Sequence, residues 1–170
     1  FIPQLQLEFP KIDFRFVHGL SREMTEKVIS WEADFGVVVN PIQHPDLVIN
    51  PLYEDEVTLF HTENANKKLI YDPNLTQSQY ILKHLAHKSN FKGDIHSANL
   101  ELVAKLASLG VGYGLLPSRI AYQYPQLKKL KNAPLLIDEI CLIYRHDKHR
   151  NIISQIIIAT IKNTFRSPLE

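Results

Sequence analysis

The spacing of apolar residues along the chain changes repeatedly between the two-residue period of strands and the three-to-four-residue period of helices. Apolar side chains at every second position of residues 12–17 predict a half-buried strand. The uninterrupted, largely β-branched run in residues 35–39 is typical of a strand covered on both faces, as in a parallel sheet. In residues 100–109 the apolar side chains recur on one helical stripe, and Gly110 provides a stop. These patterns predict strands and helices in turn.

The rest of the chain continues this alternation. Ser21 is a candidate cap for a helix in which Met24, Val28 and Trp31 share one face. The remaining predicted strands lie at residues 57–60, 69–71, 111–117 and 140–144 and around Ile95, and the remaining helices at residues 1–9, 76–88 and 151–165. Strands that alternate with helices in this way favour an α/β fold with mostly parallel sheets.

The composition narrows the classes of function. With 170 residues, 45% of them hydrophobic and 22% charged, the chain is long enough for one globular domain or two small lobes. A net charge of +1 argues against a free-standing nucleic-acid binder, which usually carries a strong basic excess. The longest apolar runs are too short to cross a bilayer, and no signal-peptide pattern is present. The single cysteine, Cys141, lies in an apolar run and fits a buried thiol, so a cytoplasmic location is expected.

Two histidine pairs have a spacing that zinc sites use. His84 and His87 are three residues apart on a predicted helix, and His146 and His149 are three apart near a turn. Neither pair has a nearby cysteine or a convincing carboxylate as a third ligand. Solvent-facing histidines are therefore the favoured interpretation over a zinc site, and no metal or other cofactor is predicted.

The motifs of enzymes are weak in this chain. The glycines of residues 110–114 follow a helix and lead into a strand, which is the wrong order for a dinucleotide-binding loop and suits a tight turn. The acidic residues 54–56 precede a predicted strand and are expected in an exposed loop or at the start of that strand. We therefore predict no enzyme and no catalytic residues. The alternative of an enzyme would place its acid or base at Glu101 or Asp94.

Polar residues recur at the ends of the predicted strands or at the starts of the helices that follow them. In an open α/β sheet these positions lie beyond the carboxyl ends of strands, where helix N-termini present free N–H groups to ligands. Each such residue has the alternative role of capping the next helix. The repeated pattern predicts a small-ligand cleft formed by Ser21, Asn40, His61, Asn74, Thr76, Gln77, Ser97 and Asn99.

Several stretches, in order along nearly the whole chain, resemble the effector-binding domain of LysR-type transcriptional regulators. The most specific is the leucine–valine helix of residues 100–109, followed by glycine-x-glycine and then Leu115-Leu116-Pro117. The others are the opening helix and alternating stretch of residues 1–17, the Trp31–Val38 segment, the proline–leucine–acidic segment of residues 50–56, and the stretch Tyr144–Asp147 before the last helix.

The resemblance implies a fold like type II periplasmic binding proteins, in which two Rossmann-like α/β lobes are joined by two crossover segments. Lobe I would comprise residues 1–61 and 138–170, and lobe II residues 62–137. A small effector, polar or anionic, would bind between the lobes. Ser21, Asn40 and His61 would contact it from lobe I, and Asn74, Gln77, Ser97 and Asn99 from lobe II.

The resemblance also implies partners. Such regulators form homodimers, usually tetramers at full length, and bind DNA through a winged helix-turn-helix domain that this chain lacks. The resemblance implies that the first strand of the sensing domain also precedes the residues of this chain. Val39 is apolar where some members carry a polar or basic ligand contact, so their ligand class does not transfer to this chain. The alternative function is a solute-binding protein of the same fold that serves transport.

Overall fold

The computed structural model describes residues 1–86 and 88–166, which form two compact units. Unit 1 consists of Phe1–Glu54 with Glu139–Glu170, and unit 2 of Asp55–Asp138. The sequence places the first boundary after residue 61, whereas the structure divides the chain inside strand β2 (Leu47–His61). The second boundary lies inside β7 (Leu136–Arg145), so each crossover segment is a continuous strand that runs from one unit into the other.

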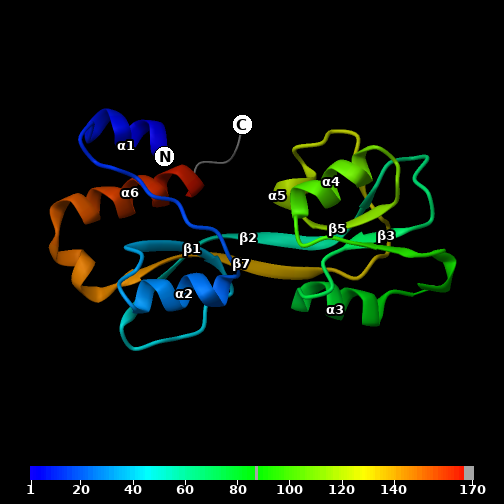
Figure 1. The fold of residues 1–170 in the computed structure, drawn as a ribbon, viewed down its shortest axis with the longest axis horizontal. Coiled ribbons are helices and arrows are strands. Elements are labelled where there is room, and N and C mark those ends of the chain that lie inside the picture. Colours follow the sequence, from blue (N-terminus) through cyan, green and yellow to red (C-terminus); the bar gives the residue numbers. More distant parts are fainter. Residues whose placement is uncertain (87, 167–170) are drawn as a thin grey trace. The chain divides into compact units, whose positions relative to one another are not determined.

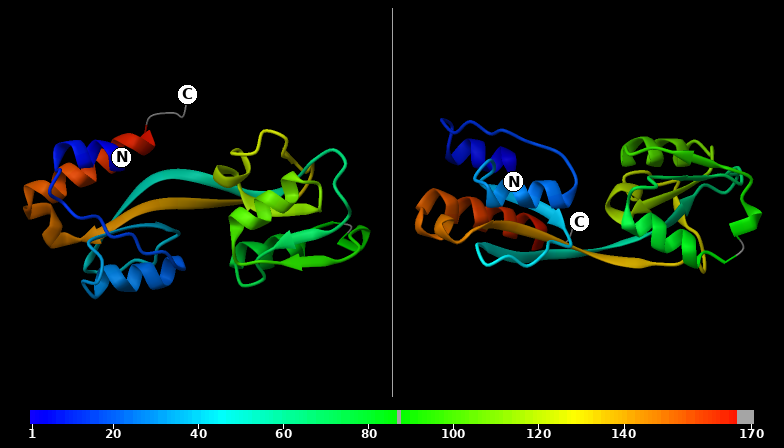
Figure 2. Two further views of the ribbon diagram at one scale, coloured as in Figure 1. Left: turned by 45° about the horizontal axis from the view of Figure 1, so that its top comes forward. Right: turned by 60° about the horizontal axis from the view of Figure 1, so that its bottom comes forward.

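In unit 1 a small antiparallel arrangement of strands separates two helices (Figure 1). β1 (Phe35–Val39) pairs with β7 so that Phe35 lies opposite Tyr144 and Val39 opposite Ile140. Val28 of α2 (Ser21–Ile29) packs with Cys141 and Ile143 of β7, whereas Ile158 and Ile161 of α6 (Ile152–Arg166) pack with the alternate residues Leu142 and Tyr144. Because neighbouring residues on a strand point to opposite faces, the two helices cover opposite faces of β7. Helix α1 (Ile2–Glu8) lies beside α6, as Figure 2 also shows.

Unit 2 has parallel strands in one part of its sheet, whereas mostly parallel sheets are predicted. β5 (Tyr113–Pro117) lies between β2, to which it is antiparallel, and β3 (Leu69–Tyr71), to which it is parallel. β4 (Asp94–His96) adds to the other side of β3, again in parallel, and β6 (Lys128–Lys129) pairs with the end of β2.

The helices of unit 2 cover both faces of this sheet. Ile81 of α3 (Thr76–His84) packs in one core with Tyr71, whereas Val103 of α4 (Leu100–Ser108) packs in another core with Ile70. Ile70 and Tyr71 are neighbours on β3, so α3 and α4 lie on opposite faces of the sheet. The short helix α5 (Ser118–Ala121) belongs to the α4 face, because Ile120 packs in the same core as Val103.

Four sequence predictions about unit 1 are wrong. Residues 12–17 form no strand, because their backbone has no ladder partner among the described residues. Trp31 does not share a helix face with Val28, since α2 ends at Ile29 and Trp31 has a left-handed φ of 67°. Ser21 is not a cap, because the N-cap position is Leu20. β1 is not covered as in a parallel sheet but is an edge strand, antiparallel to β7.

In unit 2 the differences are smaller. Helix α3 ends at His84, and a 3-10 helix (η1) at Lys88–Asn90 follows, whereas a helix over residues 76–88 is predicted. β2 begins at Leu47 rather than at residue 57, so Asp55 lies inside the strand. Only 4% of its surface is exposed, so of the two expected placements, an exposed loop or the start of the strand, the exposed loop is wrong for this residue. The tight turn at the glycines is confirmed, with a φ of 76° at Gly110.

The buried thiol is confirmed, since Cys141 is fully buried. Burial, together with a hydrogen bond to Glu139, raises the pKa of this thiol to about 12. Within residues 1–86 and 88–166, no helix is long and apolar enough to cross a bilayer.

Candidate functional site

The carboxyl ends of three parallel strands meet at one edge of unit 2. β3, β4 and β5 run in the same direction, so their last residues lie at the same edge, hereafter the carboxyl edge. Helices α3, α4 and α5 begin there, α3 on one face of the sheet and the other two on the opposite face. A switch of this kind opens a crevice beyond the strand ends, which is where open α/β sheets bind their ligands.

Asn74 and Gln77 lie at the start of α3 on this edge. The backbone N–H of Asn74 donates to the buried carboxylate of Asp72 at 2.9 Å, which turns the chain from β3 into the helix. Nε2 of Gln77 donates to Oδ2 of Asp138 at 2.9 Å, so this side chain is already engaged with β7. Among the described residues no side chain caps α3, so the N–H groups of its first turn can donate to a bound molecule.

Ser97 and Asn99 lie in the turn from β4 into α4. The N–H of Asn99 donates to Oγ of Ser97 at 3.1 Å, and Oδ1 of Asn99 accepts from the N–H of Leu102 at 3.1 Å. Asn99 is therefore the N-cap of α4, the alternative role that its position allows. The two predicted lobe II pairs, one at each helix start, lie at the same edge of the sheet.

Beside them lies a hydrogen-bonded group, Tyr71, Asp94 and His96, that the sequence did not predict. The hydroxyl of Tyr71 donates to Oδ2 of Asp94 at 2.9 Å, and Nε2 of His96 lies 3.1 Å from the same hydroxyl oxygen. Since the Tyr71 proton is used on Asp94, Nε2 of His96 must carry the proton that it donates to Tyr71. Burial, aided by Asp94, raises the pKa of Tyr71 to about 12. Only the parallel pairing of β3 with β4 brings these residues together, so no motif could reveal them.

Two buried hydroxyls at the same edge have no hydrogen-bond partner among the described residues. Ser78 lies in the first turn of α3 and is 1% exposed, and Ser118 is the first residue of α5 and is 6% exposed. A buried hydroxyl without a partner is uncommon in folded proteins. In the sequence, only the position after a predicted strand distinguishes these two serines.

In unit 1, Ser21 and Asn40 come together at the end of β1. Oγ of Ser21 accepts from the N–H of Val39 at 3.0 Å, which joins the start of α2 to the last residue of the strand. Asn40 adopts a left-handed φ of 46°, and its Oδ1 accepts from the N–H of Glu139 at 2.8 Å. The predicted pair is thus assembled within unit 1 by hydrogen bonds to β1 and β7.

The structure does not bring His61 to the carboxyl edge. β2 is antiparallel to β5, so the end of β2 lies where β5 begins. The His61 ring stacks on Tyr113, the first residue of β5, with the ring centroids 4.6 Å apart. An open cavity of about 600 Å3, bordered by Thr62, Asn64 and Lys128 among others, lies in the loops at this opposite edge.

A metal centre is not formed by the described residues. Within residues 1–86 and 88–166, no three His, Cys, Asp or Glu side chains gather as ion ligands. His84 is exposed and its Nδ1 lies 2.8 Å from the carbonyl oxygen of Tyr80, whereas His87 lies outside the described residues.

Comparisons with known proteins agree with this architecture. A family model described as the LysR substrate binding domain matches residues 1–166. Among curated relatives, the HTH-type transcriptional regulator BbuR of Bordetella bronchiseptica is 23% identical over 131 residues, which are 68% of this chain and 40% of BbuR. The HTH-type transcriptional regulator GltR of Bacillus subtilis is 22% identical over 149 residues, or 77% of this chain and 50% of GltR. The chain thus spans half the length of these relatives or less.

Solved structures show the same fold. The regulatory domain of HypT from Salmonella typhimurium, in a variant form, has a TM-score of 0.73 at 15% identity and covers 97% of this chain and 91% of its own. The reduced OxyR regulatory domain from Pseudomonas aeruginosa has a TM-score of 0.70 at 16% identity, covering 97% and 88%. The fold is therefore that of type II periplasmic binding proteins, and the chain belongs to the LysR substrate binding domain family.

Proposed function

We propose that this chain is the effector-sensing domain of a LysR-type transcriptional regulator and that it binds a small polar or anionic metabolite at the carboxyl edge of unit 2. The observation that carries the proposal is the meeting of the first turns of α3 and α4 at that edge, on opposite faces of one parallel sheet. Both curated relatives are transcriptional regulators and neither is a transport protein, which favours sensing over transport.

The effector would be held mainly by neutral hydrogen-bonding groups. Ser97 and the exposed side of His96 flank the start of α4, and Asn74 and Gln77 flank the start of α3. Helix N-termini carry a partial positive charge and unpaired N–H donors, so they stabilise carboxylates and other anions without a basic side chain. Ser21 and Asn40 are proposed to contribute from unit 1, and His61 is left out because it lies at the opposite edge.

In the whole regulator, binding would change gene expression by a shift between two conformations. A ligand that prefers one arrangement shifts the population toward it, and a coupling of about 1–3 kcal/mol changes the affinity of a distant site about 5- to 150-fold. We propose that the full-length regulator forms homodimers or tetramers and has a DNA-binding domain outside this chain. The conformational shift would then change how the DNA-binding domains of the oligomer meet the operator half-sites.

The experiment is a thermal-shift screen of this chain against amino acids, organic acids, aromatic acids and inorganic anions. A ligand at a hundred times its Kd stabilises the fold by about 2.7 kcal/mol. Each hit is then measured against Asn99→Asp, which keeps an oxygen cap on α4 and adds a negative charge beside the bound molecule. An anionic effector is expected to lose at least tenfold in affinity, which corresponds to about 1.4 kcal/mol.

Asn64→Asp is the matched control, because it makes the same change in an exposed loop at the opposite edge of unit 2. It should leave the affinity unchanged. Equal losses from both variants, or a screen with no hit in any class, would contradict effector binding at the carboxyl edge.

A further inference from the structure

Trp31 occupies a position that the backbone would assign to glycine. The N–H of Glu32 donates to the carbonyl of Lys27 at 2.9 Å, and the N–H of Trp31 to the carbonyl of Val28 at 3.4 Å. This pair of bonds is the Schellman ending of α2, in which the left-handed residue is usually glycine. Trp31 adopts a φ of 67°, which is strained for a bulky side chain, yet the residue is 58% exposed. Packing in the core of unit 1 therefore does not account for a tryptophan at this strained position.

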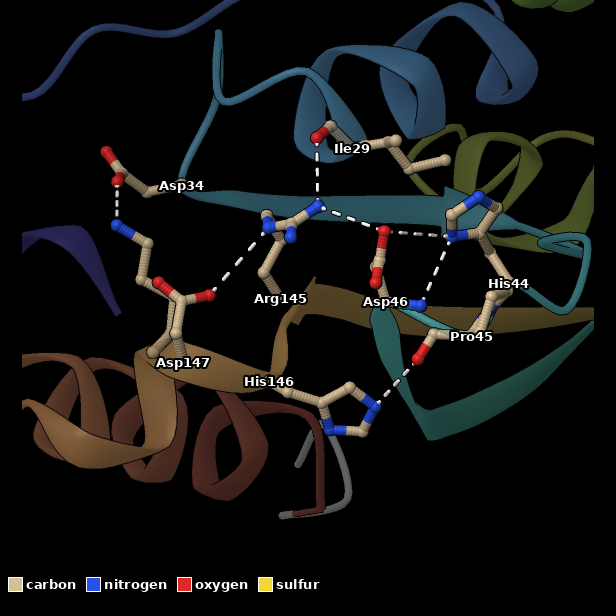
Figure 3. A network of polar contacts seen from close by, with 9 residues as sticks. Ile29, Asp34, His44, Pro45, Asp46, Arg145, His146 and Asp147 are labelled. Carbon is tan, nitrogen blue, oxygen red and sulfur yellow. Dashed lines mark hydrogen bonds and ion pairs between the residues drawn. The ribbon is translucent and has the colours of Figure 1, made fainter.

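One face of that ring is covered by a guanidinium that two carboxylates share. The guanidinium carbon of Arg145 lies 4.3 Å from the ring centroid. Its Nη1 donates to the carbonyl of Ile29 at 3.0 Å and lies 3.5 Å from Oδ2 of Asp46, while Nε lies 3.8 Å from Oδ1 of Asp147 (Figure 3). One cation therefore faces two carboxylates, each of which is about half exposed. A unit of negative charge is left over on this side.

A positive charge without a partner among the described residues, that of Arg150, lies close by in the sequence and lines the same cavity. Lys148 is paired with Asp34 at 2.5 Å and does not balance the surplus. Arg150, at the end of the 3-10 helix η2 (His146–Arg150), is exposed and has no hydrogen bond or ion pair within the described part of the chain. Trp31, Asp46, Arg145, His146, Asp147 and Arg150 line one cavity of about 270 Å3. When partners are counted among the described residues only, the cavity combines an exposed aromatic residue, one carboxylate in excess and one guanidinium without an ion pair.

We propose that this cavity binds a small zwitterion, a free amino acid with an apolar or aromatic side chain. The carboxylate of the ligand pairs with the guanidinium of Arg150, whose five donors suit a bidentate contact. Its ammonium group lies against Asp147 and Asp46, and its side chain rests on the exposed part of the Trp31 ring. The two charged groups of the ligand thus pair with the excess positive and the excess negative charge of the cavity, and its side chain covers exposed apolar surface.

This cavity is separate from the residues of unit 1 to which the proposed function assigns the effector. Trp31 and Arg145 lie at the end of β1 that holds Phe35, whereas Ser21 and Asn40 lie at the end that holds Val39. Five residues of strand span about 13 Å between these two ends. The cavity is therefore proposed as a second ligand site, and its test is independent of the test of the effector site.

The single tryptophan of the chain makes this site directly observable. Trp31 fluorescence, excited at a wavelength where phenylalanine does not absorb, is titrated with phenylalanine, with 3-phenylpropionate, which lacks the amine, and with 2-phenylethylamine, which lacks the carboxylate. Phenylalanine should change the fluorescence saturably, and each analogue should bind at least tenfold more weakly. The proposal would be overturned if either analogue bound as tightly as phenylalanine. It would also be overturned if the fluorescence showed no saturable change at phenylalanine concentrations up to 20-fold above a millimolar Kd.

Two variants identify the contacts. Arg150→Gln should weaken phenylalanine at least tenfold and leave 2-phenylethylamine unchanged, because the amine does not use the guanidinium. Asp147→Asn should weaken phenylalanine and leave 3-phenylpropionate no weaker than before. Arg15→Gln removes the same charge from an exposed position of unit 1 with no ion pair among the described residues, and it should change nothing. If Arg15→Gln and Arg150→Gln had equal effects, the change in net charge would account for both, and this would contradict a site at Arg150.

Discussion

The carboxylate of Asp55 holds the start of α5 through both the backbone and the side chain of Arg119. The N–H of Arg119 donates to Oδ1 at 3.2 Å, and its guanidinium donates to Oδ2. The carboxylate is 4% exposed and the arginine side chain 34% exposed. Asp55 lies where β2 enters unit 2, so this ion pair fixes the end of β5 and the helix after it to the crossing strand.

Asp55→Ala is expected to lower the free energy of unfolding by about 2 kcal/mol. Removing one partner of a fully buried pair costs about 3–5 kcal/mol, and the loss is smaller here because water solvates the freed guanidinium in part. Urea denaturation measures the difference. Arg22→Ala, which breaks the exposed pair with Glu26, is the control and should cost under about 0.5 kcal/mol. Similar costs for the two variants would contradict a structural role of the Asp55 pair.

Trp31→Gly and Trp31→Ala separate backbone strain from side-chain contacts. Both remove the ring and its stacking on Arg145, but only glycine adopts the φ of 67° without strain. Trp31→Gly is therefore expected to be more stable than Trp31→Ala by about 1 kcal/mol. Equilibrium urea unfolding of both variants gives the comparison. An alanine variant as stable as the glycine variant would show that the left-handed turn is not strained.

The alkaline stability of the fold should depend on Tyr71. Burial and Asp94 raise the pKa of this phenol to about 12, above its ordinary value of 10.0. Below pH 10 both the folded and the unfolded forms are protonated; between pH 10 and 12 only the unfolded form loses its proton, so stability falls as the pH rises. Cys141, with a pKa also raised to about 12, adds to the same loss.

Tyr71→Phe should therefore show a smaller fall in the free energy of unfolding between pH 9 and pH 11 than the parent chain. Tyr122→Phe, which changes an exposed phenol, should keep the fall of the parent. Urea denaturation at the two pH values is the measurement. An unchanged fall in Tyr71→Phe would assign the alkaline loss to other groups.

Gly112 allows close packing of two backbone segments rather than an unusual φ. A Cβ atom at this position would lie 2.6 Å from the carbonyl oxygen of Lys68, which is part of the backbone next to β3. Gly112→Ala should therefore lower stability by about 2 kcal/mol through displacement of that segment. Gly19→Ala is the control, because the nearest atoms there end the flexible side chains of Met24 and Glu23. A loss in Gly112→Ala no larger than in the control would show that the segment yields freely.

Most of the fold follows from local patterns in the sequence. Strands β3, β4 and β5 and helix α4 agree with the predicted elements because hydrophobic periodicity, the glycine turn and the Asn99 cap all act within a few residues. Residues 12–17 show where this reasoning fails. Their alternating pattern is compatible with a strand, but a strand forms only when a second backbone supplies ladder hydrogen bonds.

The candidate sites divide in the same way. Asn74, Gln77, Ser97 and Asn99 could be predicted, because each follows a strand within a few residues and parallel strands end together. His61 also ends a strand, but the direction of β2 is set by its antiparallel pairing with β5, which no local pattern reveals.

The sequence by itself thus determined the succession of elements from β3 to β5, the α/β class and the polar starts of α3 and α4, since these depend on neighbours along the chain. Only the tertiary structure decided which residues meet across it. Tyr71 meets Asp94 and His96 through strand pairing, and Trp31 meets Arg145 because β7 returns beside the end of α2. Such contacts join residues far apart in the chain, and their geometry exists only once the packing of the core has fixed every strand beside its partner.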